Sequence, residues 1–265
     1  MPFDVEEFVR YQIMNAKVRG YPFPHLYVSP IFPPDYYELL QRNLPPTAWY
    51  RPLEETNSVK PTQESAENSS GFAERFIADL ADVEEREEQA RTGDFWRRVS
   101  EWITGNRFHA LVVRKFEPAI TARFGAGAKL ATGIDARLVR DFSRYAIGPH
   151  TDSKTKLVSL LFYLPKDAAM SHLGTSIYAP VDPSFRCPGG PHHPFGMFRK
   201  VATMPFAPNA LFGFFKTDRS FHGVDQILDD NVERNLLLYN IYVRKVSKRA
   251  VRKWPWSALG GRASD

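Results

Sequence analysis

The sequence predicts a mainly β protein with helical support (α+β), in which helices from the first half of the chain brace a barrel or jelly roll of short strands. Three observations lead to this fold class. The second half carries short β-prone runs separated by Pro, Gly, Asp and Asn, as in barrels and jelly rolls. The first half carries amphipathic runs at helical spacing. The 21 Pro residues and an aromatic content of 14% favour a loop-rich sheet protein over a helical bundle.

The first half of the chain is predicted to be mostly helical. Residues 5–18 place apolar side chains at helical spacing, with acidic residues early and a lysine late. A helix is expected to open at Pro33 and Pro34, because proline is tolerated in a first turn. Amphipathic spacing predicts another helix over residues 71–90. The other predicted elements of this half are a strand over 22–28, a loop over 57–70, a helix starting at Asp94 and a helix over 107–116.

The second half supplies the predicted strands. They are expected over 129–134, 136–145, 156–164, 176–179, 210–216 and 235–245. The long segment over 180–208 is expected to be a loop, and long loops in compact domains are often functional. Because the chain shows no repeat of fixed period and no low-complexity linker, we expect a single domain. Its parts are mostly helical support over 1–125, a jelly-roll core over 126–245 and a basic tail over 246–265.

Composition and charge exclude several classes of protein. The 265 residues suffice to bury a core, and 43% hydrophobic and 25% charged residues are ordinary for a globular protein. The net charge of +5 is concentrated at the end of the chain, because residues 244–265 alone hold seven Lys and Arg against one Asp. This location argues against nucleic-acid binding, and no apolar stretch is long enough to span a membrane. The single cysteine, Cys187, rules out an internal disulfide framework, so we expect a cytoplasmic protein.

A His-x-Asp tripeptide, residues 150–152, stands directly before the predicted strand over 156–164. In an extended chain residues i and i+2 point to the same face, so His150 and Asp152 can present a nitrogen and an oxygen to one point. One more histidine would complete the 2-His-1-carboxylate facial triad of non-haem Fe(II) oxygenases, which leaves positions open for co-substrate and oxygen. Taken alone, such a tripeptide is more often a turn pair than a pair of ligands.

A second signal lies in residues 211–224, where a β-prone run leads into a polar turn that contains His222. Twelve residues later Arg234 opens the apolar run over 235–243. A buried arginine needs an anionic partner, because an unpaired buried charge is costly, and a guanidinium pairs bidentately with a carboxylate. The order of His-x-Asp, strand, distant His and Arg is much rarer by chance than any one of its parts.

Taken in order, His150, Asp152, Tyr163, His222 and Arg234 resemble the signature of the Fe(II)/2-oxoglutarate-dependent dioxygenases, in the branch that includes the prolyl hydroxylases. The resemblance implies a double-stranded β-helix, which is a jelly roll with helices packed against one sheet. It also implies that the two histidines and the aspartate hold Fe(II) and are the catalytic centre.

The same resemblance, which covers residues 130–245 well and residues 20–45 weakly, implies roles for neighbouring side chains. Arg234 is expected to grip the distal carboxylate of the co-substrate 2-oxoglutarate. Tyr163 is expected to donate its hydroxyl to the same carboxylate. Tyr145 stands where many relatives have a tyrosine near the co-substrate.

The implied reaction consumes 2-oxoglutarate and O2, releases succinate and CO2, and hydroxylates an unactivated C–H bond, with a small molecule as the first expectation for the substrate. Asp152 favours hydroxylation or another oxidation such as desaturation, because relatives that halogenate have a small residue at this place. A protein or peptide side chain is the alternative substrate. Candidate substrate contacts are Arg144, Tyr178 and Arg219.

Two alternatives come from other classes of protein. One is a cupin-like metal-binding jelly roll without 2-oxoglutarate chemistry, in which Arg234 and Tyr163 would have no assigned anion. The other is a non-catalytic binding protein that retains the fold, since a fold does not imply a function. The intact set of ligand residue types argues against the second alternative.

A zinc site in the long loop is a weaker hypothesis. Its ligands would have to come from His172, Cys187, His192 and His193. Adjacent histidines that follow a cysteine after four residues do not match the usual spacing of zinc ligands. These four side chains are therefore expected to be ordinary loop residues.

Overall fold

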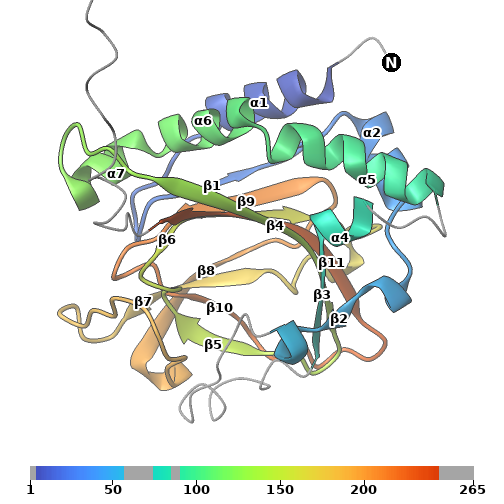
Figure 1. Ribbon diagram of the computed structural model, residues 1–265. Coiled ribbons are helices and arrows are strands. Elements are labelled where there is room, and N and C mark those ends of the chain that lie inside the picture. Colours follow the sequence, from blue (N-terminus) through green and yellow to red (C-terminus); the bar gives the residue numbers. More distant parts are fainter. Residues whose placement is uncertain (1–3, 57–73, 85–89, 245–265) are drawn as a thin grey trace, which may run out of the picture.

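The computed structural model describes residues 4–56, 74–84 and 90–244, which form two antiparallel sheets beneath a layer of helices (Figure 1). The larger sheet has seven strands and the smaller sheet has four. The loop predicted over 57–70 and the basic tail predicted over 246–265 lie outside the described residues.

Eight consecutive strands form the central part of the two facing sheets. They are β4 (Thr132–Phe142), β5 (Ile147–His150), β6 (Lys156–Tyr163), β7 (Thr175–Pro180), β8 (Phe198–Met204), β9 (Ala210–Phe215), β10 (His222–Val224) and β11 (Glu233–Val243). Strands β9, β6, β11 and β4 are neighbours in the larger sheet, whereas β5, β10, β7 and β8 form the smaller one. The chain thus passes repeatedly from one sheet to the other, which is the connectivity of a jelly roll. The predicted double-stranded β-helix is confirmed.

Three further strands extend the larger sheet. Strand β1 (His25–Val28) pairs with β9 at one edge, while β3 (Arg75–Asp79) pairs with β4 and β2 (Arg51–Pro52) pairs with β3 at the other. The prediction of a helix over 71–90 is wrong for residues 75–79, which form β3, and in the described part of that range β3 is followed by the short helix α4 (Leu80–Glu84). Without β3, strand β4 would expose a row of unpaired backbone groups. Tertiary strand pairing therefore outweighs the local helical spacing.

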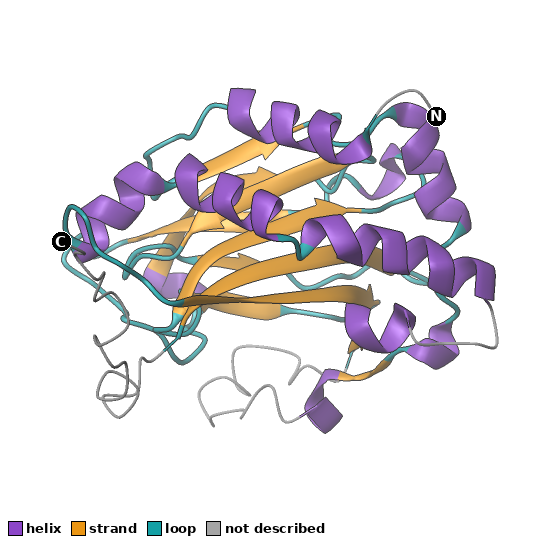
Figure 2. Ribbon diagram, turned by 45° about the horizontal axis from the view of Figure 1, so that its top comes forward, coloured by secondary structure: helices purple, strands orange, loops and turns teal. Residues whose placement is uncertain are grey.

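Helices cover the outer face of the larger sheet, as Figures 1 and 2 show. They are α1 (Val5–Asn15), α2 (Pro34–Arg42), α5 (Ala90–Ile103), α6 (Asn106–Lys115) and α7 (Glu117–Phe124). Helix α1 begins where the Asp4 carboxylate accepts a hydrogen bond from the Glu6 amide at 3.0 Å. Helix α2 carries Pro34 in its first turn, as predicted. No described helix combines the length and apolarity needed to cross a membrane.

The larger sheet divides its side chains between two environments. On β6, Val158, Leu160 and Phe162 are fully buried in the core shared with the helices. The alternate residues Ser159 and Leu161 face the smaller sheet. Strand β11 divides in the same way, with Leu237, Tyr239 and Ile241 toward the helices and Arg234, Leu236 and Leu238 toward the smaller sheet. Alternate residues of each strand therefore face opposite layers, as the two-residue period of a strand requires.

The segment over 180–208, predicted as one long loop, contains strand β8 paired with β7. That prediction is wrong for residues 198–204, because β8 has several consecutive exposed side chains and no two-residue alternation to reveal it. The other connections hold single turns of 3-10 helix. These turns are η1 (Thr47–Trp49), η2 (Leu53–Thr56), η4 (Ala168–Met170) and η5 (Phe195–Met197).

Candidate metal centre

The imidazoles of His150 and His222 stand opposite each other in the smaller sheet. His150 ends β5, His222 begins β10, and the two residues are directly paired in the antiparallel register. Their ring centroids lie 4.3 Å apart. Each Nδ1 lies 2.9 Å from a backbone carbonyl oxygen, that of Gly148 for His150 and that of Ser220 for His222. Each Nδ1–H therefore donates to the backbone, and each Nε2 is left as a ligand atom.

Asp152 brings a carboxylate to the same point from the turn after β5. Its φ of 64° is left-handed, a conformation that aspartate adopts more readily than most residues. The buried hydroxyl of Thr151 donates to the carbonyl of Cys187 at 2.8 Å and anchors this turn. Asp152 Oδ1 lies 3.8 Å from His150 Nε2, and Oδ2 lies 3.7 Å from His222 Nε2. One ion can bridge such pairs, because two ligand atoms each about 2.1 Å from an ion lie at most about 4.2 Å apart.

Burial and neighbouring charges set the protonation of the triad. Burial lowers the pKa of His150 well below its ordinary value, and the nearby His222 lowers it further. Burial is also the main cause that lowers the pKa of His222. Burial by itself would raise the pKa of Asp152, but Lys156 and the two histidines outweigh it and hold that pKa far below its usual range. At neutral pH the triad is two neutral imidazoles and one carboxylate, all in the state that binds a metal ion.

Two side chains of β6 hold the carboxylate in place. Lys156 Nζ donates to Asp152 Oδ1 at 3.0 Å, and Ser159 Oγ lies 3.5 Å from Oδ2. The side chains of Lys156 and Asp152 are only 13% and 12% exposed. Partners of this kind orient a ligand and restrict its rotamers.

A cavity of about 80 Å³ opens beside the triad, between the two sheets. The triad contributes side chains from the smaller sheet, and the larger sheet contributes Arg75 and Arg234. Apolar side chains fill the wall between these polar groups. They are Ile147, Leu161, Phe214, Val224 and Leu238.

Two arginines and the aspartate between them form a row across the larger sheet. Asp141 on β4 is opposite Arg75 on β3 and opposite Arg234 on β11. Arg75 donates to both carboxylate oxygens at 2.6 and 2.8 Å, and Arg234 Nη1 donates to Oδ2 at 2.6 Å. Arg234 also donates from Nε to the carbonyl of Leu173 at 2.8 Å and lies 3.4 Å from Thr175 Oγ1. Asp141 is therefore the anionic partner that a buried Arg234 was expected to need.

The two predicted co-substrate tyrosines lie next to this row. Tyr163 is fully buried, and its hydroxyl donates at 2.9 Å to Oγ1 of Thr175, a residue that lines the cavity. The Tyr145 ring lies 4.4 Å below the guanidinium of Arg75. Within the described chain, the buried Tyr145 hydroxyl has no hydrogen-bond partner. Burial is the main cause that raises the pKa of both phenols, so both are neutral donors.

The three candidate substrate contacts lie away from the cavity. Arg144 is exposed in a surface hollow beside Glu74. Tyr178 donates its hydroxyl to Asp225 at 2.8 Å. Arg219 lines a separate groove with residues of the chain before β1. The structure does not bring these three side chains together with the triad.

His192 lies beside the triad, a position that the sequence did not predict. Its ring centroid is 4.7 Å from that of His150, and burial is the main cause that lowers its pKa to about 4. The segment over 187–193 packs directly on the turn of Asp152. At Gly189, with a φ of 136°, an added Cβ would lie 2.5 Å from the Asp152 carbonyl oxygen, so this approach requires glycine.

Sequence reasoning also missed Arg75 and Asp141. Arg75 fell inside a predicted helix, and its partner is 66 residues away in the sequence. The available signal was Asp141 itself, because an acid within a β-prone run indicates a buried ion pair.

No protein-family model matches the chain, and no curated protein matches it significantly. Solved structures similar to it include a prolyl-4-hydroxylase from Pseudomonas putida, with 13% identity, a TM-score of 0.45 and coverage of 90% of this chain and 98% of that one. A prolyl 4-hydroxylase from Phytophthora capsici has 14% identity and a TM-score of 0.48, over 93% of this chain and 68% of that one. The α-ketoglutarate-dependent epimerase SnoN has 14% identity and a TM-score of 0.46, over 90% and 80%. The assignment of chemistry to this chain rests on the geometry of its own side chains.

Proposed function

We propose that this chain is an Fe(II)- and 2-oxoglutarate-dependent oxygenase that hydroxylates a C–H bond of a small molecule, with release of succinate and CO2. One observation carries the proposal. The ligand atoms of His150, Asp152 and His222 lie within 4.8 Å of one another on a cavity that Arg234 also lines. The triad supplies a metal ion with three protein ligands, and the arginine supplies a cation for the co-substrate.

The donor set fits Fe(II). Two imidazoles and one carboxylate that leave other coordination positions open are the ligands of non-haem Fe(II) oxygenases. A structural zinc site would instead use four protein ligands, usually including cysteine thiolates. Among the described residues, the cluster capable of holding an ion has three members and no cysteine. Its chemistry therefore suits a catalytic metal that takes further ligands from the reactants.

The surroundings of Arg234 fit a dicarboxylate such as 2-oxoglutarate. Asp141 is shared between two guanidinium groups, so this row keeps one positive charge in excess. The buried Tyr145 hydroxyl lacks a partner among the described side chains, and a buried donor without an acceptor is costly. A carboxylate bound beside Arg234 would pair with that guanidinium and would accept from the hydroxyls of Thr175 and Tyr145.

In the reaction, the bound metal together with 2-oxoglutarate and O2 supplies the oxidising chemistry. The chain's residues hold and orient the reactants. The Nδ1 bonds of His150 and His222 to the backbone fix the two rings, so that their Nε2 atoms would be the atoms that hold the metal. Lys156 fixes the rotation of Asp152. The apolar wall, which includes Leu161 and Phe214, limits the access of water to the cavity.

An anaerobic titration tests the proposal. The Fe(II)-loaded protein is expected to bind 2-oxoglutarate, with an absorption band for the metal-chelated keto acid, and to release succinate when air is admitted. Arg234→Met should weaken binding by about tenfold or more, because a hydrogen bond to a charged group contributes about 1.5–3 kcal/mol. Arg137→Met on β4 is the matched control, since Arg137 pairs with Asp79 and Asp135 and does not line the cavity.

Two results would overturn the assignment. One is the absence of both the absorption band and succinate. The other is an Arg234→Met protein that binds 2-oxoglutarate as tightly as the parent. A protein that binds the metal but not the keto acid would instead be a cupin-like site.

A further inference from the structure

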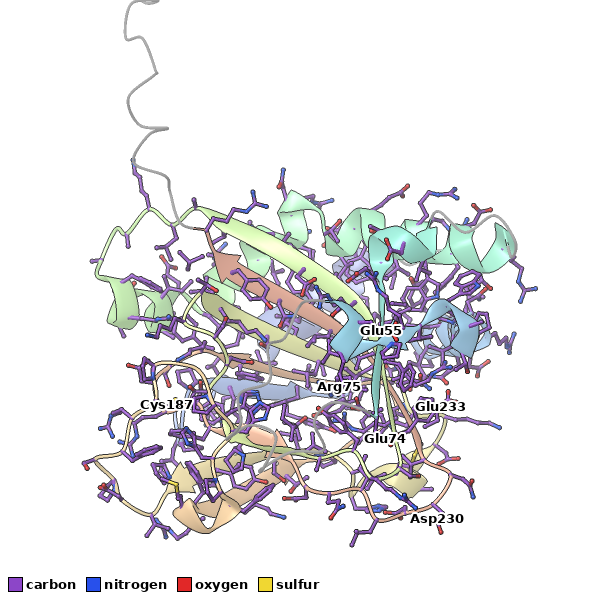
Figure 3. The ribbon with its side chains drawn as sticks, turned by 60° about the horizontal axis from the view of Figure 1, so that its bottom comes forward. Glu55, Glu74, Arg75, Cys187, Asp230 and Glu233 are labelled. Carbon is purple, nitrogen blue, oxygen red and sulfur yellow. The ribbon has the colours of Figure 1, made fainter. Side chains whose placement is uncertain are left out.

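The function proposed above assigns no bound molecule to Arg75, yet Arg75 lines the same cavity as the triad. It lies at the start of β3 (Figure 3), on the face that carries Asp141 and Arg234. Its side chain is 17% exposed, whereas those of Asp141 and Arg234 are 0% exposed. Arg234 is therefore the deep cation of the row, and Arg75 is the one nearer to solvent.

One edge of the Arg75 guanidinium has no partner among the described residues. Nε and Nη2 donate to the two oxygens of Asp141, so the edge of the guanidinium formed by these two nitrogens is occupied. The other edge, formed by Nη1 and Nη2, receives no contact from a described acceptor. A guanidinium can bind a second carboxylate along this edge, because its five N–H donors form two forks. Stacking on the Tyr145 ring at 4.4 Å fixes the plane of the group.

The charges of the cavity leave a place for an anion. Its wall carries the cations Arg75, Lys156 and Arg234 and the carboxylate of Asp152, and Asp141 adds a second carboxylate behind the arginines. This wall has a net charge of one positive. A divalent metal and a dianionic co-substrate cancel each other, so the excess remains when both are bound. In a low-dielectric cavity, this one excess positive charge strongly favours the binding of a monoanion.

We propose that Arg75 recognises a carboxylate on the substrate, so that this enzyme oxidises small carboxylic acids in preference to neutral molecules. This inference rests on the proposed function, because it takes the triad as the metal site and Arg234 as the co-substrate site. Arg75 positions the substrate's carboxylate at the solvent side of the cavity and leaves the rest of the molecule against the apolar wall beside the metal.

Matched pairs of compounds test the inference. The probes are short aliphatic and aromatic acids, each with its primary amide, which has the same shape and no charge. Binding is measured by calorimetry on the Mn(II)- and 2-oxoglutarate-loaded protein without oxygen, and succinate release is measured on the Fe(II)-loaded protein in air. The parent protein should bind acids more tightly than their amides by about tenfold or more, the factor that one charged hydrogen bond supplies.

Substitutions assign this preference to Arg75. In Arg75→Met the ratio of acid to amide affinity should fall close to one, and Arg75→Lys should retain part of it because the charge remains. The affinity for 2-oxoglutarate should fall by a smaller factor than the affinity for the acids. Circular dichroism and urea unfolding verify that the variants fold. Arg137→Met is the control and should keep the parent's ratio.

The failures of the two proposals are distinguishable. If the parent does not bind 2-oxoglutarate, the proposed function is wrong and this inference falls with it. If the parent binds 2-oxoglutarate but no acid binds more tightly than its amide, only the present inference is overturned. It is also overturned if Arg75→Met loses 2-oxoglutarate more severely than the acids, because Arg75 would then belong to the co-substrate site.

Discussion

The cavity has two polar sides that are stabilised in opposite ways. On the smaller sheet, the triad consists of two neutral imidazoles and a carboxylate, whose orientation comes from short-range contacts to Gly148, Ser220 and Lys156. On the larger sheet, the row of Arg75, Asp141 and Arg234 consists of full charges, in which one carboxylate pairs with two guanidinium groups across three strands. The triad has ligand atoms directed at a common point, whereas the row is held together by its own ion pairs. Mutations in the row should therefore reduce mainly the stability of the protein, whereas mutations in the triad should reduce mainly its affinity for the metal.

The largest expected effect is that of Asp141→Asn. Removing the shared carboxylate leaves two buried guanidinium groups without their partner, so we expect a loss of about 3–5 kcal/mol in the free energy of unfolding. Urea unfolding measures this loss. Asp82→Asn is the control, because Asp82 is 56% exposed and should change stability by about 0.5 kcal/mol or less. Equal effects of the two substitutions would contradict the structural role of the row.

On the other side, His150→Ala should affect the metal more than the fold. We expect the affinity for Fe(II) or Mn(II) to fall by at least about 100-fold, since even partners outside the ligand set contribute about 10–100-fold. The stability of the metal-free protein should fall by less than in Asp141→Asn. Calorimetry with Mn(II) measures the affinity. The exposed His172, substituted by alanine, should leave it unchanged.

Gly223→Ala should reduce both the stability of the protein and its affinity for the metal. An added Cβ would lie 2.5 Å from the Ile147 carbonyl oxygen, so β10 must move away from β5 and carry His222 with it. We expect a loss of about 1–3 kcal/mol in stability, as for other overpacked sites, together with weaker Mn(II) binding. Gly196→Ala, where a Cβ meets open space, is the matched control. A stable Gly223→Ala protein with full metal affinity would show that the register of these strands is not needed.

The smallest effect concerns His25, a buried histidine of β1 outside the triad. Burial is the main cause that lowers its pKa below 6.5 in the folded state. The unfolded chain therefore binds more protons, and stability that is fully present above pH 6.5 is lost as the pH falls below it, by at most about 1.4 kcal/mol per pH unit. His25→Phe should have a shallower loss of unfolding free energy between about pH 7.5 and 5.5 in the metal-free protein. If the unfolding free energy of His25→Phe fell with pH as steeply as that of the parent, the loss of stability in acid would come from other groups.

The two sides also differ in how far the sequence predicts them. His150 and Asp152 are two residues apart, so strand geometry alone places their side chains together. His222 could be added because its order relative to His150 and Arg234 resembles a family signature. Asp141 and its two arginines meet only through the pairing of β3, β4 and β11, across separations of 66 and 93 residues. Strand pairing of that range leaves no local pattern, and the helical spacing around Arg75 indicated the wrong element.

The fold shows the same limit. Strands β6 and β11 were predicted close to their observed positions, because both are long β-prone runs that are buried on both faces. Strand β8 was missed because its exposed side chains resemble those of a loop. The position of His192 was missed for a related reason, since it depends on how the segment over 187–193 packs against a turn that is distant in the sequence.

That packing has a consequence for protein engineering. The carbonyl of Cys187 accepts from the Thr151 hydroxyl, Gly189 packs on the Asp152 carbonyl, and the His193 amide donates to the Pro149 carbonyl at 2.9 Å, so all three contact the segment that carries His150 and Asp152. Loop exchange is a common route to altered selectivity, but a graft that replaced residues 187–193 here would also shift the ligand-bearing turn. Libraries aimed at new substrates should therefore keep this segment intact and vary side chains such as Arg75.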